Sequence, residues 1–239
     1  MDALRSELAL LKIELRNIAQ SNPTRGISPQ EVDAFINSIL RKISFACMHQ
    51  TLIAGINWDQ VPQLGRRSSQ CAVLEVPLME ATLRIEHSES LTDYVYLSLD
   101  GLVAALANMS DTLARLINQI YALGVPDRQA SILAIRDRCT RTSPLGMVLY
   151  SPIHMDWLVK IRDLRGRCQH ADLEEILLVA SGSYGNRHAE PSVPRDYSWR
   201  SAPTDLLITT FALESMQKAE RAFIAMAQSI RTNPIDPLH

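Results

Sequence analysis

The sequence predicts an all-α fold, in which a helical bundle carries one irregular insertion and one long late loop. Glycine occurs only 9 times and aromatic residues make up 5% of the 239 residues, whereas β-barrels and β-sandwiches need a turn signal every few residues. Hydrophobic residues are 46% and charged residues 21% of the chain, as in soluble globular proteins. Apolar residues also recur at helical spacing along most of the chain, so helices are favoured over strands.

Two amphipathic helices are expected in residues 1–55, which we assign to an N-terminal helical pair that packs on the core. The first should end at Ser21-Asn22-Pro23. The second begins at Ser28-Pro29-Gln30-Glu31, a capping box with proline at the first helical position, and should end by Gly55. The apolar seam of the first helix, with alternating steps of four and three, is Leu4, Leu8, Leu11, Leu15 and Ile18.

Residues 56–90 are interpreted as an irregular insertion. Pro62, Gly65 and Pro77 interrupt any regular pattern there. Within this segment, a short strand is indicated by the alternation of Ala72, Leu74, Val76 and Leu78 with other residues.

The most regular periodicity belongs to a long helix that follows the insertion. Its apolar residues are spaced by alternating four and three residues, and Gly124 and Pro126 are expected to end it. At ~1.5 Å per residue such a helix spans more than ~40 Å, so it is either the central rod of a bundle or lies along a partner chain. The periodic residues are Val95, Leu99, Leu102, Leu106, Met109, Leu113, Leu116, Ile120 and Leu123.

The remaining elements belong to a helical core that we assign to residues 91–239. A short helix is expected around Asp127 to Cys139, and the last helix from about Thr204 to Ile230. Residues Arg141 to Pro152 contain two prolines and a glycine and are interpreted as a loop. A long polar loop is expected from Ser181 to Pro203, and loops of that length are usually functional.

One further helix, ahead of the long polar loop, carries the most concentrated positive charge. Helical geometry at ~100° per residue places Arg165 about 80° to one side of its buried stripe and Arg167 about 80° to the other. The stripe, with steps of four, three and four, is Trp157, Ile161, Leu164 and Cys168. The cations and histidine near the end of the helix are Lys160, Arg162, Arg165, Arg167 and His170.

Arg165 and His170 are five residues apart, so on a straight helix their directions diverge by about 140°. A shared site therefore requires the helix to bend or end near Gly166, or a second copy of the segment to contribute. The alternative is a solvated helix face with weak ion pairs at i,i+4 spacing, such as Asp163 with Arg167.

Several classes of chemistry are excluded by the sequence. It has no GxGxxG, GxxxxGK[ST] or GxSxG motif, no Glu-x-x-His pair and no HExxH. The 4 cysteines show no CxxC spacing and are expected to be free thiols in a reducing compartment. We expect neither a metal nor a cofactor.

The charge and hydropathy of the sequence limit where the protein is expected and what it is expected to bind. The net charge of -2 and the isoelectric point near 6.3 exclude a uniformly basic nucleic-acid coat, although a local basic patch is compatible with them. No apolar run approaches the ~18 residues that span a bilayer, so a cytoplasmic protein without membrane contact is expected.

The segment Arg165-Gly-Arg-Cys-Gln-His170 resembles the R-x4-H motif of the HEPN superfamily (higher eukaryote and prokaryote nucleotide-binding domains). The helix order is similar too. A long helix through Tyr94 to Asp111, a helix led by Trp157 that ends in the motif, and a final amphipathic helix follow one another as in bacterial stand-alone HEPN proteins. The resemblance covers Leu91 to Ile230.

The resemblance implies a HEPN-like bundle that forms a homodimer with apposed motif helices and cuts RNA without metal. It assigns catalysis to Arg165 and His170, which would assist attack of the ribose 2′-hydroxyl on the adjacent phosphate. The hypothesis extends to a toxin or phage-defence role with an antitoxin or defence-system protein as partner. Asp111 would support the site by orienting one of these residues, or it is a surface acid. The RNA-binding residues would be Lys160, Arg162 and Arg167.

The sequence departs from the family pattern directly after the motif arginine. Catalytic members usually carry Asn, His or Asp there, whereas this chain has Gly166. One alternative function is therefore a non-catalytic RNA-binding or protein-interaction module that uses the same basic helix. Another is a structural helical subunit of a larger assembly, which the long helix would suit.

Overall fold

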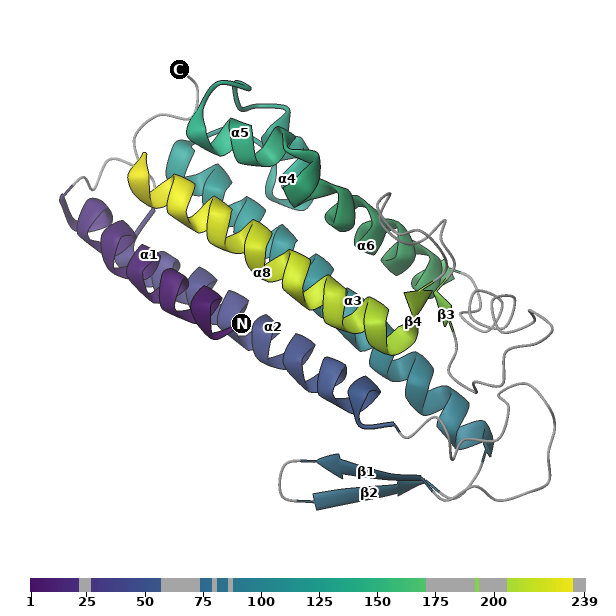
Figure 1. Ribbon diagram of the computed structural model, residues 1–239. Coiled ribbons are helices and arrows are strands. Elements are labelled where there is room, and N and C mark those ends of the chain that lie inside the picture. Colours follow the sequence, from purple (N-terminus) through teal and green to yellow (C-terminus); the bar gives the residue numbers. More distant parts are fainter. Residues whose placement is uncertain are drawn as a thin grey trace. The chain divides into compact units, whose positions relative to one another are not determined.

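The computed structural model describes residues 1–21, 27–56, 74–78, 81–85, 88–170, 192–193 and 206–233, and helices account for most of them (Figure 1). The predicted all-α class is confirmed. Most of the insertion and of the late loop lies outside the described residues, as does Cys71. The helices are α1 (Asp2–Ser21), α2 (Pro29–Ala54), α3 (Ser88–Tyr121), α4 (Ile132–Arg136), α5 (Pro144–Tyr150), α6 (Pro152–His170) and α8 (Ile208–Thr232), with a 3-10 turn at Asp127–Gln129.

Two short antiparallel strand pairs accompany the helices. The alternation in the insertion corresponds to β1 (Leu74–Leu78), which pairs with β2 (Ala81–Ile85) in a register that places Val76 opposite Leu83. The alternation from Ala72 to Leu78 indicated a strand here, whereas β2 was not predicted. The second pair joins β3 (Ser192–Val193) to β4 (Leu206–Leu207) just before α8.

The chain divides into two compact units, each built from separate stretches of sequence. Unit 1 comprises Met1–Ser44, Ala105–Leu158 and Gln217–His239, and unit 2 comprises Phe45–Ala104 and Val159–Met216. The helices α2, α3, α6 and α8 each contribute residues to both units.

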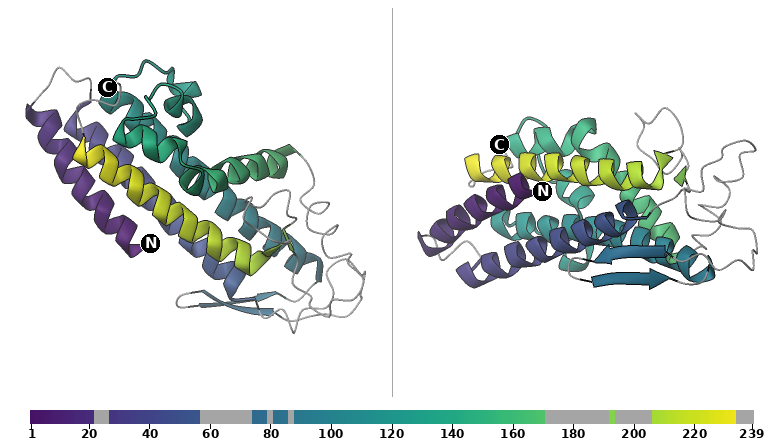
Figure 2. Two further views of the ribbon diagram at one scale, coloured as in Figure 1. Left: turned by 45° about the horizontal axis from the view of Figure 1, so that its top comes forward. Right: turned by 60° about the horizontal axis from the view of Figure 1, so that its bottom comes forward.

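Within unit 1, α1 runs beside the first part of α2 and the last part of α8 (Figures 1 and 2). Lys12 forms an ion pair with Asp33 of α2 at 3.3 Å. Arg231 of α8 forms one with the buried Glu7 at 3.1 Å, and the amino group of Met1 pairs with Glu220. Because Glu7 is only 8% exposed, loss of its cation would leave a carboxylate without compensation in the core.

The long helix α3 is buried over a wide face. All nine residues of the predicted periodic series are buried, as the spacing required. Their neighbours Val103, Ala107, Ala114 and Ile117 are also 0% exposed, so the buried face is wider than a seam between two helices. This width is typical of a helix in the centre of a bundle.

The end of α3 differs from the prediction. The helix ends at Tyr121, three residues before Gly124, because Ala122 adopts a left-handed conformation with φ 50°. The amide of Leu123 then donates to the Asn118 carbonyl at 3.1 Å, as in a Schellman motif. The buried Asn118 side chain also bonds both backbone groups of Val125, at 2.8 and 3.1 Å, which fixes the turn.

The interpretation of Arg141 to Pro152 as a loop was wrong, because α5 occupies Pro144–Tyr150. Pro144 stands at the first helical position, where its missing N–H costs nothing, and Ser143 caps the helix by accepting from the Gly146 amide at 3.0 Å. The same signal was read correctly in α2, where Ser28 and Glu31 form the predicted capping box.

Alanine substitutions should show that a glycine is required at Gly146, where the backbone of Thr140 approaches closely, and is not required at the exposed Gly166. A Cβ at Gly146 would lie 1.8 Å from the Thr140 carbonyl oxygen, a backbone atom, whereas a Cβ at Gly166 would meet nothing within 4 Å. We expect Gly146→Ala to lower the free energy of unfolding by about 1–3 kcal/mol. Gly166→Ala should raise it by about 0.5–1 kcal/mol, because alanine is the better helix former. Urea denaturation followed by circular dichroism would measure both, and equal stability of the two variants would contradict the close approach at Gly146.

Candidate functional site

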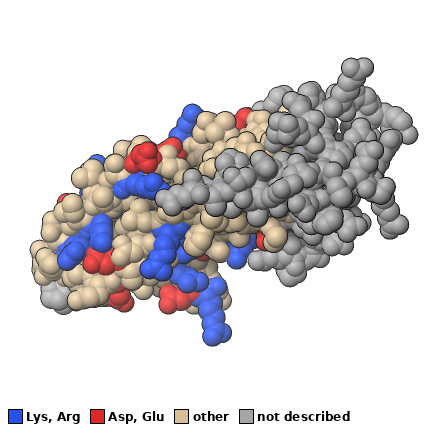
Figure 3. All heavy atoms as spheres, turned by 90° about the horizontal axis from the view of Figure 1, so that it is seen from below, with Lys and Arg blue, Asp and Glu red and all other residues tan. Residues whose placement is uncertain are grey.

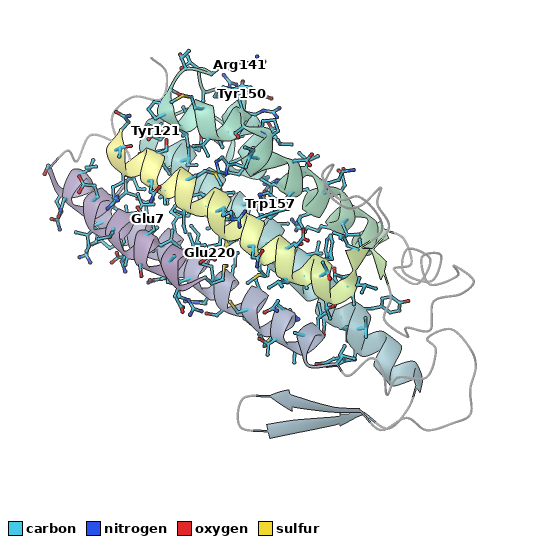
Figure 4. All side chains as sticks on the ribbon, viewed as in Figure 1. Glu7, Tyr121, Arg141, Tyr150, Trp157 and Glu220 are labelled. Atoms are coloured by element: carbon cyan, nitrogen blue, oxygen red, sulfur yellow. The ribbon has the colours of Figure 1, made fainter. Side chains whose placement is uncertain are left out.

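The predicted motif lies at the C-terminal end of α6. The helix begins at Pro152, and the Ser151 carbonyl accepts from the amides of His154 and Met155 at 3.1 and 3.0 Å. Its predicted stripe is buried where side chains are described, since Trp157, Ile161 and Leu164 are at most 1% exposed. Within unit 1, the Trp157 ring meets the Phe223 ring edge-on, with centroids 6.2 Å apart (Figure 4).

The cations of α6 flank this stripe. Lys160, Arg162 and Arg165 are half-buried, and each takes part in a polar, ring or electrostatic interaction. The Nε atom of Arg165 is closed off from solvent. The side chains of Arg167, Cys168 and His170 lie outside those that the structure describes, so the predicted meeting of Arg165 with His170 is not placed.

The backbone of α6 nevertheless constrains any site built from Arg165 and His170. The helix runs to His170, so it does not end at Gly166, which is exposed. Two residues five positions apart on a regular helix point about 140° away from each other. A common site then requires a bend within α6 or a contribution from a second copy of the chain.

The predicted supporting residue, Asp111, lies in the part of α3 that belongs to unit 1. Its side chain is half-buried and takes part in an interaction within the protein. Arg165 belongs to unit 2. A role for Asp111 in orienting Arg165 or His170 therefore stays a prediction.

A basic and aromatic cluster that the sequence analysis missed lies in unit 1, at α4 and α5. The guanidinium carbon of Arg141 lies 4.9 Å from the centroid of the Tyr150 ring, and that of Arg136 lies 5.6 Å from it (Figure 4). Tyr150 is the last residue of α5. The signal that could have revealed the cluster is the Ser143-Pro144 helix start, which places Tyr150 on a helix instead of in a loop.

Two further histidines, His49 and His154, are half-buried and were not among the predicted site residues. His49 in unit 2 packs so closely on α3 that a Cβ at Gly101 would lie 2.2 Å from its ring. Burial lowers the pKa of His49, and the nearby carboxylate of Asp100 offsets part of this effect. His154 lies in the first turn of α6, and burial lowers its pKa as well.

Neither of the two cysteines with described side chains, Cys47 and Cys139, forms a disulfide. Cys139 is buried, and burial raises its pKa to about 11, so its thiol is protonated and unreactive at neutral pH. Cys47 is half-buried. Among the residues with described placement, no three His, Cys, Asp or Glu side chains gather in a way that could hold a metal ion.

The surface charge is mixed in sign. In the visible face of the space-filling view, Lys and Arg side chains alternate with Asp and Glu over the part that is not grey (Figure 3). This agrees with the net charge of -2. Over the part of this face that is not grey, no broad area of basic side chains is seen (Figure 3). None of the described helices combines the length and the apolar character needed to cross a lipid bilayer.

Comparison of the chain with models of protein families, with curated proteins and with solved structures found no match.

The lowered pKa values of the two histidines predict a pH dependence of stability. Because the folded state disfavours their protonation, the stabilising contribution is present above the ordinary pKa near 6.5 and is lost as the pH falls toward the folded pKa. Each histidine can change the free energy of unfolding by at most about 1.4 kcal/mol for each pH unit. The free energy of unfolding, measured by urea denaturation, should fall as the pH is lowered from 7.5 to 5.5.

The matched variants are His49→Gln and His154→Gln. Each should flatten the pH profile of stability, and the double variant should flatten it further, because glutamine does not titrate in this range. A profile that all three variants share with the wild type would contradict the assignment to these two residues.

Proposed function

We propose that the protein is a metal-independent endoribonuclease of HEPN type. The observation that carries the proposal is the R-x4-H spacing at the end of α6, with Arg165 at the edge of a buried helical stripe. The order of the long helix α3, the motif helix α6 and the final helix α8 supports it. A cytoplasmic location and a toxin or phage-defence role, with an antitoxin or defence-system partner, belong to the same proposal.

The chemistry needs only these two residue types. A histidine that is neutral near pH 7 accepts the proton of a ribose 2′-hydroxyl while its oxygen bonds to the adjacent phosphorus. The bond from phosphorus to the 5′-oxygen breaks, and the histidine, now protonated, gives its proton to that oxygen. An arginine donates two hydrogen bonds to the phosphorane oxygens as their charge develops. The products are a 2′,3′-cyclic phosphate and a 5′-hydroxyl.

The geometry of α6 favours a composite site in a homodimer. Residues 165 and 170 diverge by about 140° on a regular helix, so one copy alone does not direct both into one pocket. Two motif helices around a two-fold axis would bring Arg165 of one protomer toward His170 of the other. Lys160, Arg162 and Arg167 would hold the flanking phosphates.

Substitution of the motif residues should abolish cleavage. We expect Arg165→Ala to reduce the cleavage rate about 100- to 1,000-fold, as for loss of one donor to a developing oxyanion. His170→Ala should reduce it about 100- to 10,000-fold, because proton transfer is lost. Cleavage of a labelled RNA in EDTA would be measured, with the exposed Arg221→Ala as control. Equal cleavage by wild type and both motif variants would reject the assignment.

Mixing the two inactive variants tests the composite site. A dimer of one Arg165→Ala and one His170→Ala protomer keeps one site in which both residues are native. Random mixing in equal amounts should restore about a quarter of wild-type activity, because half of the dimers are mixed and each holds one of two sites intact. If mixing restored nothing while each variant still dimerised, both residues of a site would come from the same protomer.

A second function is favoured by Gly166, which stands exposed where catalytic family members carry a polar residue. The α6 helix would then bind RNA, or a partner protein, without cutting. Binding that weakens with rising salt, with intact RNA recovered afterwards, would favour this function over the nuclease.

A further inference from the structure

The cluster on Tyr150 is held in place by the backbone around it. Ser143 Oγ accepts from the Gly146 amide at 3.0 Å and donates to the Thr140 carbonyl at 2.9 Å. The absence of a side chain at Gly146 lets Thr140 approach the helix closely. Arg141 follows Thr140 directly, so the turn that carries its guanidinium is fixed against α5 and therefore against Tyr150.

The charges of this cluster are incompletely balanced. Arg136 forms an ion pair with its neighbour Asp137 at 3.1 Å. Arg141 is exposed, and so is Arg138, which lies in the turn of the chain between Arg136 and Arg141; neither forms an ion pair with a carboxylate of the described residues. Two guanidinium groups on one ring repel each other, and an anion held between or beside them would remove this repulsion. The geometry thus suits a ligand that carries negative charge.

The aromatic ring indicates that the ligand contains a planar group as well as a negative charge. Tyr150 is half-buried, with its ring under the guanidinium groups. A guanidinium plane that stacks on an aromatic ring can take a nucleobase on its opposite side, and proteins that bind single-stranded nucleic acid combine such stacking with cations for the phosphates. An acidic peptide would need the charges but would gain little from the planar stack.

We propose that Arg136, Arg138, Arg141 and Tyr150 form a contact site for single-stranded RNA, separate from the motif in α6. A base stacks on the Arg141 guanidinium, which Tyr150 supports from below, and Arg138 binds a neighbouring phosphate. The choice of RNA as the nucleic acid rests on the proposed function. The site would hold substrate by a segment that is not cut.

The test is binding of a fluorescently labelled single-stranded RNA of about 15 nucleotides, measured by anisotropy in EDTA. All proteins carry Arg165→Ala and His170→Ala, so that the RNA stays intact. We expect Arg141→Ala and Tyr150→Leu each to raise the Kd about 5- to 100-fold, as for loss of one stacked base. Arg138→Ala should reduce the slope of log K against log salt by about 0.7. The exposed Arg221→Ala is the control and should leave the Kd unchanged.

Conservative variants and altered ligands test the stacking itself. Tyr150→Phe should bind like the parent, since the ring is kept. Arg141→Lys, on an exposed side chain that does not carry the fold, should bind several-fold more weakly because lysine keeps the charge without the plane. An RNA without bases at its central positions should bind as weakly to the parent as normal RNA binds to Arg141→Ala.

Two results would overturn the proposal. One is unchanged RNA binding in both Arg141→Lys and Arg141→Ala. The other is poly-glutamate binding as tight as that of RNA and equally sensitive to Arg141→Ala, which would indicate an acidic protein partner. Failure of the nuclease proposal is distinguishable from either, because it appears in the cleavage assay as equal activity of wild type and motif variants, and the binding series does not depend on it.

Discussion

The burial of the apolar surface of α3 is the constraint on which the other elements depend. Residues on several adjacent rows of this helix are closed to solvent, among them Leu102, Val103, Leu106 and Ala107. A helix of 34 residues with such a surface is stable in water only when other helices cover it. Truncation of one buried leucine typically costs about 2–5 kcal/mol, comparable to much of the stability of a domain. The described charged side chains of α3, which are Asp100, Asp111 and Arg115, lie outside this buried face.

The long helices could be predicted from the sequence because their periodicity reports burial directly. The predicted apolar residues of α3 are all buried, as are Leu4, Leu8, Leu11 and Leu15 of α1 and Trp157, Ile161 and Leu164 of α6. Ile18, at the end of the α1 seam, is only half-buried. The capping box at Ser28 was equally local, since all its hydrogen bonds lie within four residues. Local rules succeed where the partners of an interaction are close in the chain.

The failures arose where one residue type is compatible with two local structures. Pro144 and Gly146 were interpreted as helix breakers, whereas proline is neutral at a helix start and Gly146 allows the close approach of Thr140, six residues earlier. The left-handed Ala122 was not foreseen because alanine rarely adopts that conformation, and here the Asn118 hydrogen bonds hold the turn. Gly166 was a candidate break in α6, yet the penalty of about 1 kcal/mol for glycine is small beside the burial of Leu164.

The candidate site was only partly within reach of sequence reasoning. The spacing placed Arg165 beside the buried stripe, where the structure has it half-buried. It could not reveal which arginines share a ring, because Arg136, Arg141 and Tyr150 meet only through the fold of the α4–α5 turn. The two groups of cations differ accordingly. Helical geometry places those of α6 on both sides of its buried stripe, whereas Arg136 and Arg141 converge on one aromatic side chain.

The division of the chain into interleaved stretches has a consequence for its biosynthesis. Unit 1 includes both Met1–Ser44 and Gln217–His239, so the ribosome must make nearly the whole chain before this unit can close. Until then α1 and α2 emerge with apolar seams such as that of Leu4, Leu8 and Leu11 uncovered. Nascent chains of this kind are natural clients of chaperones that shield exposed hydrophobic surface. A stalled or truncated translation product would also lack the parts of α8 that complete either unit, and so would be prone to degradation.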